Sequence, residues 1–288
     1  MKGRKFGDRR DARRVKLPAL MQCCIDLKPE RCHNEVYINE KMDVTNLVKY
    51  IEDKKAQGIH YTYFQAFMTA IGKVIYNRPK LNYFITNRHL YEHNEVSLAF
   101  VAKISLNDSS EELMLIVKIE PEDTIETISA KLNTKVEKLR NKSMEKKGSN
   151  NAIDYLGVLP NVIRVPIFGL IKWLDKHGWL PKALTDDNIY FSSMIISNLG
   201  SIGCGAIYHN ISDFGTSSSL TTMGKITTEE VFADDGSKEI KKFCEFGITL
   251  DERIGDGFYF ANSAKMIEYI LMNPELLEEP ASSKVNMK

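Results

Sequence analysis

The sequence predicts an α+β fold in which helices flank a mixed β-sheet. Segments with apolar residues at every third or fourth position are interspersed with short apolar or alternating runs, and Gly, Pro and Asn separate them. A chain of 288 residues can bury one large core, although it lies near the size at which chains divide. We expect one domain at 20–280, a basic flexible arm at 1–19 and a tail at 281–288.

The first half of the chain alternates predicted strands and helices. Residues 35–45 alternate apolar and polar side chains as a half-buried strand does, and 46–55 then become helical. Residues 63–76 carry apolar side chains at helical spacing, which predicts a core-facing helix that ends before Pro79. Short strands are expected at 83–86, 95–103 and 113–119. The last of these is almost continuously apolar, which favours a central place in the sheet.

The second half adds a helix, three strands and a final helix. Residues 124–139 keep the helical period after Pro121, and a charged loop is expected at 142–151. Strands are predicted at 189–197, 217–226 and 242–251 and a helix at 256–271, ending before Asn273-Pro274. No internal repeat is present, so helices and strands belong to one mixed domain.

The segment 159–184 predicts an amphipathic helix and contains both tryptophans, Trp173 and Trp179. Its prolines and charges, among them Arg164 and Lys172, interrupt the apolar run, so it is not expected to span a bilayer. Four roles remain open. The helix could pack on its own domain, contact another subunit or partner, cover an acyl-chain pocket, or lie on a membrane surface.

Composition excludes several function classes. A net charge of +1 provides no global attraction to nucleic acid or to membranes, and we expect contact with neither. The basic N-terminal cluster is interrupted by Asp8 and Asp11, which favours a solvated arm. Five cysteines match no metal spacing, so no metal is expected. Together with the lack of an apolar leader after Met1, they indicate the cytoplasm.

Two short segments combine glycines with polar or ionisable residues. The first, Ser197-Asn198-Leu199-Gly200-Ser201-Ile202-Gly203, follows a strand and could bring backbone close to a ligand or form only a turn. The second, Asp251-Glu252-Arg253-Ile254-Gly255-Asp256-Gly257, joins a strand to a helix that Asp256 can cap. Its four charges fit either an ion-pair network or an acid/base site.

Together these segments resemble the chloramphenicol-acetyltransferase-like superfamily, in particular the catalytic domains of 2-oxoacid dehydrogenase complex dihydrolipoamide acyltransferases. Those domains have a strand ending in a Ser-Asn-Leu-Gly-like turn and, about fifty residues later, Asp-His-Arg-x-x-Asp-Gly. Residues 37–47, 67–82 and 273–277 are similar as well, so that the resemblance covers about 20–278. It implies a mixed sheet flanked by helices and a trimer with the active channel between subunits.

The resemblance also implies roles for individual residues. The family's histidine takes the thiol proton of coenzyme A or lipoamide, and Glu252 stands at its position. Ser197 matches the serine that stabilises the oxyanion, and Asp256 matches an aspartate that orders the site through an arginine. The candidates for that arginine are Arg13, Arg14 and Arg31. Asn198, Gly200 and Gly203 are implied in substrate binding, with a coenzyme A thioester as co-substrate and no covalently bound cofactor.

Because Glu252 replaces the family's histidine, both a catalytic and a non-catalytic function remain open. A carboxylate is a weaker base than imidazole, because its reference pKa is about 4.3 against about 6.5. One hypothesis is a coenzyme-A-dependent acyltransferase that transfers acyl groups between a thioester and a thiol, amine or hydroxyl, with altered or lost activity. The alternative is a non-catalytic relative that binds acyl-coenzyme A or a protein partner. A carboxylate-based hydrolase and a Cys204–His209 acyl carrier are the lesser alternatives.

Overall fold

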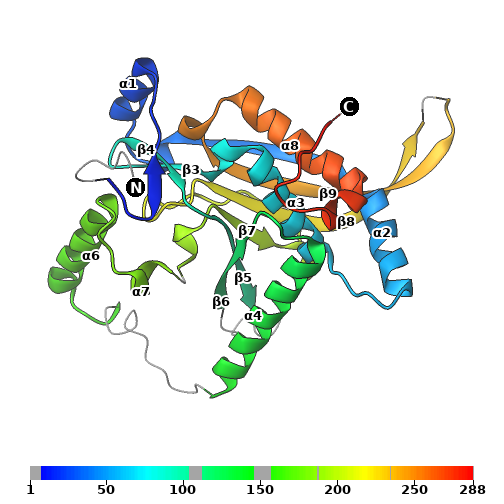
Figure 1. Cartoon of the computed structure of the whole chain (residues 1–288), viewed down its shortest axis with the longest axis horizontal. Helices are drawn as coiled ribbons and strands as arrows, with labels where there is room; N and C mark the ends of the chain where they lie inside the picture. Colours follow the sequence, from blue (N-terminus) through cyan, green and yellow to red (C-terminus); the bar gives the residue numbers. More distant parts are fainter. Residues whose placement is uncertain (1–7, 104–111, 146–156, 187, 234, 288) are drawn as a thin grey trace.

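One mixed six-stranded sheet organises the molecule (Figure 1). The computed structural model describes residues 8–103, 112–145, 157–186, 188–233 and 235–287. The strand order is β2 (Glu35–Asp43), β9 (Lys238–Asp251), β8 (Ser219–Phe232), β7 (Met194–Asn198), β5 (Val96–Lys103) and β6 (Glu112–Ile119). β7 runs parallel to β5 and β8, and the other neighbouring pairs are antiparallel. The predicted α+β class with a mixed sheet is confirmed.

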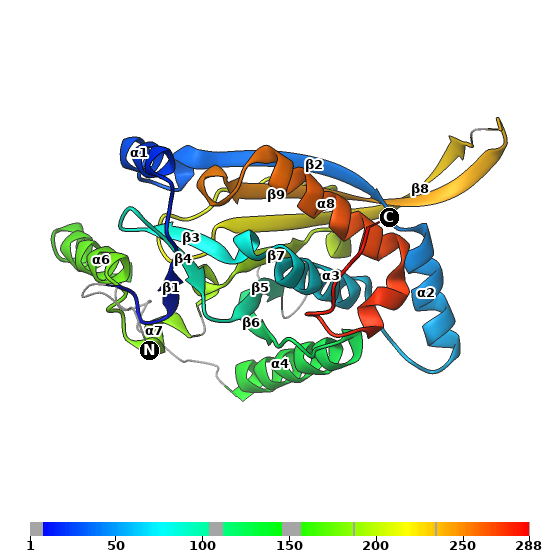
Figure 2. The same cartoon turned by 45° about the horizontal axis from the view of Figure 1, so that its top comes forward.

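Four helices pack against the sheet and bury the main core, as Figure 2 shows for α3 and α8. They are α2 (Thr45–Ala56), α3 (Tyr63–Asn77), α4 (Ile125–Glu145) and α8 (Gly257–Met272). All four were predicted, but α4 continues to Glu145 through the first residues of the charged loop predicted at 142–151, of which 146–151 lie outside the described residues. Helix α3 begins with a capping box, in which Thr62 accepts from the Gln65 amide and the Gln65 side chain accepts from the Thr62 amide.

Strand β6 lies at the edge of the sheet, and its predicted central position is wrong. Its apolar run is nevertheless buried on both sides. Leu115, Val117 and Ile119 join the main core, whereas Ile116 joins a smaller cluster on the opposite face of the sheet. An edge strand covered on both faces therefore has the same sequence signature as a central one.

Residues 8–19 of the predicted flexible arm are ordered, and the rest of the arm lies outside the described residues. β1 (Ala12–Arg14) pairs with β4 (His89–His93), which pairs with β3 (Tyr83–Thr86) to complete a three-stranded sheet. The guanidinium of Arg9 is 2% exposed and binds Asp175 and Asp11. The arm is held because buried Asp175 compensates the charge of Arg9 and because β1 pairs with β4. Strands β1 and β4 and helix α1 (Ala19–Leu27) were not predicted.

The predicted tail is part of the folded core. After the 3-10 helix Pro274–Glu278, the amide of Ala281 donates to the Asp123 carbonyl, and the amide of Val285 donates to the Asn77 side chain. The side chains of Ala281 and Val285 are both buried in the main core cluster. The buried Lys73 ammonium donates to the Pro280 carbonyl. Residues 281–287 therefore close one side of the core.

Helix α6 (Asn161–Lys176) and the short α7 (Lys182–Thr185) form the expected amphipathic segment. Both views place α6 at the periphery, away from the helices that cover the sheet (Figures 1 and 2). Asp175 is its one fully buried residue and accepts hydrogen bonds from Arg9 and from the Gly215 amide. None of the helices in the described ranges has the length and apolar character needed to cross a membrane.

The face of the sheet opposite the four helices carries a small second cluster, formed by Ala99, Ile116, Ile189, Ile195 and Leu220. The chain between β7 and β8 crosses this face, because the Ile207 amide donates to the Thr222 hydroxyl and the Ile207 carbonyl accepts from it. Gly224 and Gly247 permit that contact, since an added Cβ would meet loop backbone atoms at 2.7 and 2.4 Å. We call this surface the second face.

Candidate functional site

The turn after β7 is built by its glycines. Gly200 lies against β8 so closely that a Cβ would come within 2.6 Å of the Gly224 carbonyl oxygen, and Gly203 has φ of 78°, in the left-handed region that favours glycine. The Asn198 side chain accepts from the Ser201 amide at 3.2 Å. Folding thus accounts for these three residues, and their predicted contact with substrate stays a prediction.

Ser197 differs from the rest of its turn because its hydroxyl has no role in the fold. It lies on β7 two residues after Ile195, so strand alternation places both on the second face. Ser197 is half-buried, and within the described ranges no group hydrogen-bonds to its hydroxyl. The hydroxyl is therefore available to a ligand.

The charged motif at the end of β9 is fixed by its buried members. Asp251 is fully buried and receives two hydrogen bonds from the Arg253 guanidinium, at 2.8 and 2.7 Å. Arg253 also donates to the carbonyls of Lys28 and Pro29. Arg31 lies 3.8 Å from Asp251 and binds the Gly215 carbonyl. Burial lowers the pKa of Arg31, and the nearby charge of Asp251 opposes that shift.

Glu252 points away from this network. It opens the 3-10 turn Glu252–Ile254, its side chain is 47% exposed, and the Lys28 ammonium lies 3.7 Å from its carboxylate. Lys28 is itself exposed, so this pair contributes little. Because Arg253 is occupied by Asp251, it does not hold the Glu252 carboxylate. The ion-pair interpretation therefore holds for Asp251 and Arg253, and the acid/base role of Glu252 stays a prediction.

Asp256 caps α8, as its sequence position predicted, by accepting from the Tyr259 amide at 2.7 Å. No arginine of the described chain lies within ion-pair distance of it. The three candidate partners have other contacts: Arg13 pairs with Glu92, Arg14 with Asp8, and Arg31 with Asp251. Within this motif, the carboxylate that arginines hold is Asp251.

Ser197 and Glu252 lie far apart within one chain. Ser197 is level with Thr222 on β8, which is level with Gly247 on β9, so Glu252 stands five residues farther along the chain, directly after the end of β9. At about 3.4 Å per residue and about 4.8 Å per strand, the two positions are separated by roughly 20 Å. A reacting group cannot contact both side chains of the same copy.

The Cys204–His209 pair does not form. The Cys204 carbonyl accepts from the Lys225 amide, level with the middle of β9, whereas the Asn210 side chain, next to His209, donates to Glu35, which pairs with Asp251 at the end of β9. The loop between them runs extended across the second face, so the two side chains are at different ends of it. Cys244, on β9, is buried, and burial raises the pKa of its thiol to about 12, which makes it unreactive.

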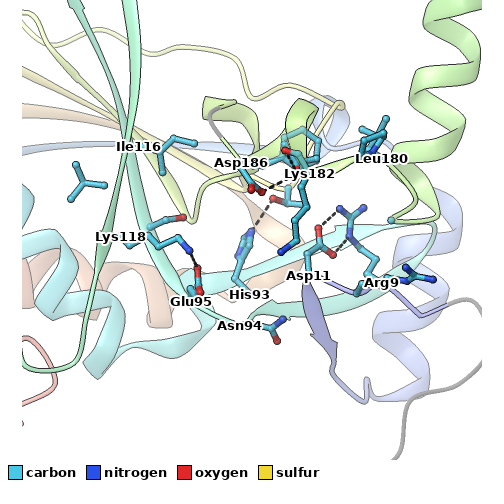
Figure 3. Close-up of a pocket in the computed structure, with 18 of the residues that line it drawn as sticks. Arg9, Asp11, His93, Asn94, Glu95, Ile116, Lys118, Leu180, Lys182 and Asp186 are labelled. Atoms are coloured by element: carbon cyan, nitrogen blue, oxygen red, sulfur yellow. Dashed lines mark hydrogen bonds and ion pairs between the residues drawn. The ribbon is translucent and has the colours of Figure 1, made fainter. Parts of the chain in front are cut away.

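A cavity of about 1150 Å³ opens beside the second face but includes neither Ser197 nor Glu252 (Figure 3). His93 lies in it with Nδ1 donating to the Asn82 carbonyl and Nε2 accepting from the Thr216 hydroxyl. Burial lowers the pKa of His93 to about 4, so the ring is neutral near pH 7. Because Arg9 pairs with Asp11 and Lys118 with Glu95, much of the cavity's charge is already neutralised.

Comparison with known proteins identifies the fold. Residues 181–278 match the family model described as 2-oxoacid dehydrogenases acyltransferase (catalytic domain), a range that contains both motifs. The cubic core of the pyruvate dehydrogenase multienzyme complex is similar at 17% identity and a TM-score of 0.60, over 91% of this chain and 92% of that one. A chloramphenicol acetyltransferase gives 11% identity and 0.53 over 90% and 99%. The chain has the chloramphenicol-acetyltransferase-like fold.

A third structure with this fold is the Azotobacter vinelandii dihydrolipoamide acetyltransferase, at 16% identity and a TM-score of 0.59 over 91% and 92% of the two chains. A serine, a histidine and an asparagine were investigated there for their role in the catalytic mechanism, and the last two are four positions apart. No curated protein matches the sequence.

Sequence reasoning missed the partners of the charged motif in this chloramphenicol-acetyltransferase-like fold. Lys28 and Arg31 precede β2 and lie more than 200 residues before Asp251 in the chain. No local pattern connects the two segments. Pairing of β2 with β9 brings Glu35 opposite Asp251 and so places the preceding residues beside the motif.

Proposed function

We propose that the protein is an acyltransferase whose site forms between two copies of the chain, with Ser197 from one and Glu252 from the other. The observation that carries this proposal is that the Ser197 hydroxyl has no hydrogen-bond partner in the described chain and Glu252 pairs with exposed Lys28 alone, yet the two positions lie roughly 20 Å apart in one chain. A second copy is required to bring a carboxylate and a hydroxyl to the same reacting carbonyl.

The proposed reaction moves an acyl group from a coenzyme A thioester to a thiol, amine or hydroxyl. Glu252 takes the proton of the acceptor, which attacks the thioester carbonyl. The hydroxyl of Ser197 donates a hydrogen bond to the resulting oxyanion. Collapse of this intermediate breaks the carbon–sulfur bond, and the departing thiolate takes the proton from Glu252. The carboxylate is thereby regenerated and no further reactant is needed.

Two comparisons support this arrangement. Asp256 follows Glu252 by four positions, as the investigated asparagine of the Azotobacter vinelandii enzyme follows its histidine. This shared spacing supports the assignment of Glu252 to the position of that histidine. A similar fold is the core of a multienzyme complex, which supports self-association of this chain, and a trimer is the assembly we expect.

The second candidate is a relative that binds acyl-coenzyme A without turnover. The observation in its favour is the carboxylate at the histidine position. In general a carboxylate is about two pKa units less basic than imidazole, a difference of roughly 3 kcal/mol in proton affinity. This candidate predicts a silent wild type and an active Glu252→His variant.

Mixed oligomers test the proposal directly. Ser197→Ala should lower acyl transfer by about tenfold to a thousandfold, and Glu252→Gln should lower it as well. Co-assembly of equal amounts of these two variants should restore about a quarter of the wild-type rate. Each restored site needs an intact serine and an intact carboxylate from adjacent copies, and each is present in half of the copies.

Equal co-assembly of wild type with the Ser197→Ala/Glu252→Gln double variant is the matched control. An intersubunit site predicts about a quarter of the wild-type rate, whereas a site within one chain predicts about half. A value of one half, with no recovery in the first mixture, rejects the intersubunit site. An unchanged rate in either single variant rejects the role of that residue.

A further inference from the structure

Helix α6 has one side that is apolar and open to solvent. Residues advance by about 100° around a helix, so Val162, Ile163, Leu170 and Trp173 share one arc. Their exposed fractions are 79%, 49%, 56% and 47%. We call these four residues the α6 apolar face. No other part of the described chain covers it, although soluble proteins rarely expose several large apolar side chains together.

The attachment of α6 directs this face outward. On the side toward the molecule, Ile167, Ile171 and Leu174 are half-buried and Asp175 is buried. Asp175 accepts from Arg9 and from the Gly215 amide, which lies beside the Arg31 network. Because the buried Asp175 carboxylate accepts hydrogen bonds from two partners, it fixes the rotation of the helix about its axis. The α6 apolar face is therefore held on the outside of the molecule.

Cations border the α6 apolar face. Lys172 and Lys176 are exposed along one edge of the arc, on either side of exposed Val165, whereas Arg164 is half-buried on the side toward the molecule and donates to the Gly157 carbonyl. The one acid of α6 is Asp175, which is buried and neutralised by Arg9. The exposed charge of the helix is therefore positive, in contrast to the nearly neutral chain as a whole.

Aromatic rings gather at the C-terminal end of this face. The ring centroids of Trp173 and Trp179 are 5.3 Å apart, and His177 lies within 4.5 Å of the first and 5.1 Å of the second. Both tryptophans are about half exposed. Tryptophan rings with one apolar body and one polar N–H are favoured at the boundary between lipid tails and headgroups.

We propose that α6 docks on an anionic lipid surface, lying in its plane with the α6 apolar face among the acyl chains and its lysines at the headgroups. Sixteen residues extend about 24 Å, less than the roughly 30 Å hydrocarbon core, so the helix lies along the surface. The complementarity of exposed lysines, tryptophans and apolar residues favours lipid over a second copy. The family match, moreover, begins at residue 181, after this helix.

The intrinsic fluorescence of the whole protein tests this proposal. Trp173 and Trp179 are the two tryptophans of the sequence, so the emission reports on this segment alone. Vesicles of phosphatidylcholine with phosphatidylglycerol should shift the emission to shorter wavelength and carry the protein into the pellet on co-sedimentation. Phosphatidylcholine vesicles alone should bind much less, and added salt should weaken binding.

Variants separate the apolar and charged contributions without removing the fluorophores. Val162→Ser/Leu170→Ser should lower vesicle affinity by more than about tenfold, since both side chains leave the apolar phase. Lys172→Ala/Lys176→Ala should lower affinity by about ten- to thirtyfold, at roughly fivefold per lysine near an anionic surface. The control is Phe232→Ser, because Phe232 is 72% exposed on the β8–β9 hairpin far from α6.

Three outcomes overturn the proposal. The first is no binding to anionic vesicles by the folded wild type. The second is binding that Val162→Ser/Leu170→Ser leaves intact, since docking would then use another surface. The third is a change of oligomer mass in that variant without vesicle binding by the wild type, which assigns the face to a second copy. Acyl transfer enters none of these readouts, so the proposed function stands or fails separately.

Discussion

The two motifs of the sheet are fixed by different physical means. The Ser197 end depends on close backbone packing, in which Gly200 lies against β8 and Gly203 adopts a left-handed turn. The Glu252 end depends on buried charge, in which Arg253 and Arg31 surround Asp251. In each motif, one ionisable or hydroxyl side chain remains unused by the fold. These two side chains, Ser197 and Glu252, are therefore available to a substrate.

The largest effect is expected from breaking the buried charges at the Glu252 end. Arg253→Ala removes a bidentate partner of fully buried Asp251 and leaves the Lys28 and Pro29 carbonyls without their donor. The free energy of unfolding should fall by about 3–5 kcal/mol, because a buried carboxylate loses most of its compensation. Urea denaturation measures this loss.

The matched control for that prediction is Lys28→Ala, which removes the exposed partner of Glu252 in the same region. Its effect should stay within about 0.5 kcal/mol. Equal losses in both variants would contradict the division between buried and exposed charges at this end.

The second-largest effect is expected at His93, which lies near Arg31 of the buried charge network at the Glu252 end. Burial lowers its pKa from 6.5 to about 4, so the unfolded chain binds a proton that the folded chain rejects between these values. Stability is therefore complete above about pH 6.5 and is lost as the pH falls toward 4. The loss reaches about 3 kcal/mol at most. The free energy of unfolding, measured from pH 7 to 4, should depend less on pH in His93→Gln than in the wild type.

His89→Gln provides the comparison for that pH series, since burial and Arg14 lower the pKa of His89 but the ring lies at the surface of the small sheet. His89→Gln should change the slope of the free energy of unfolding against pH less than His93→Gln does. Carboxylates with lowered pKa values, such as Asp123 and Asp213, lose their contribution only below about pH 4. An unchanged slope in His93→Gln would show that His93 is not the group responsible.

The third effect tests the Ser197 end. Gly200→Ala places a methyl group within 2.6 Å of the Gly224 carbonyl oxygen, and backbone on both sides limits relaxation. We expect a loss of about 1–3 kcal/mol in thermal or urea unfolding. Gly169→Ala is the control, because Gly169, like Gly200, has no positive φ, and no atom lies within 4 Å of the added methyl. A similar loss in both variants would show that the effect does not come from crowding at Gly200.

Much of the fold was predictable because it is encoded locally. The apolar periods of α2, α3, α4 and α8 gave each helix, and Asp256 was recognised as a cap from its place before a helical run. Local patterns failed where burial comes from distant chain. Strand β6 lies at an edge with both faces covered, and Arg9 is ordered by Asp175, which lies 166 residues away.

The candidate site was predictable in its residues but not in its arrangement. Ser197, Glu252 and Asp256 could be named because each stands in a contiguous motif. The distance between Ser197 and Glu252 follows from the register of β7, β8 and β9, which no local pattern contains. The same limit explains why Arg31 was considered as a partner of Asp256, whereas it binds Asp251.

The smallest effects on stability are expected at the two residues proposed for chemistry. The Ser197 hydroxyl has no hydrogen-bond partner in the described chain, and Glu252 contacts only an exposed lysine. Ser197→Ala and Glu252→Gln should therefore change the free energy of unfolding by less than about 0.5 kcal/mol while lowering any acyl transfer. Urea denaturation measures the effect of each variant on stability, and the rate of acyl transfer measures its effect on activity. A loss above 1 kcal/mol in either variant would give that side chain a role in folding and remove the contrast with Gly200 and Arg253.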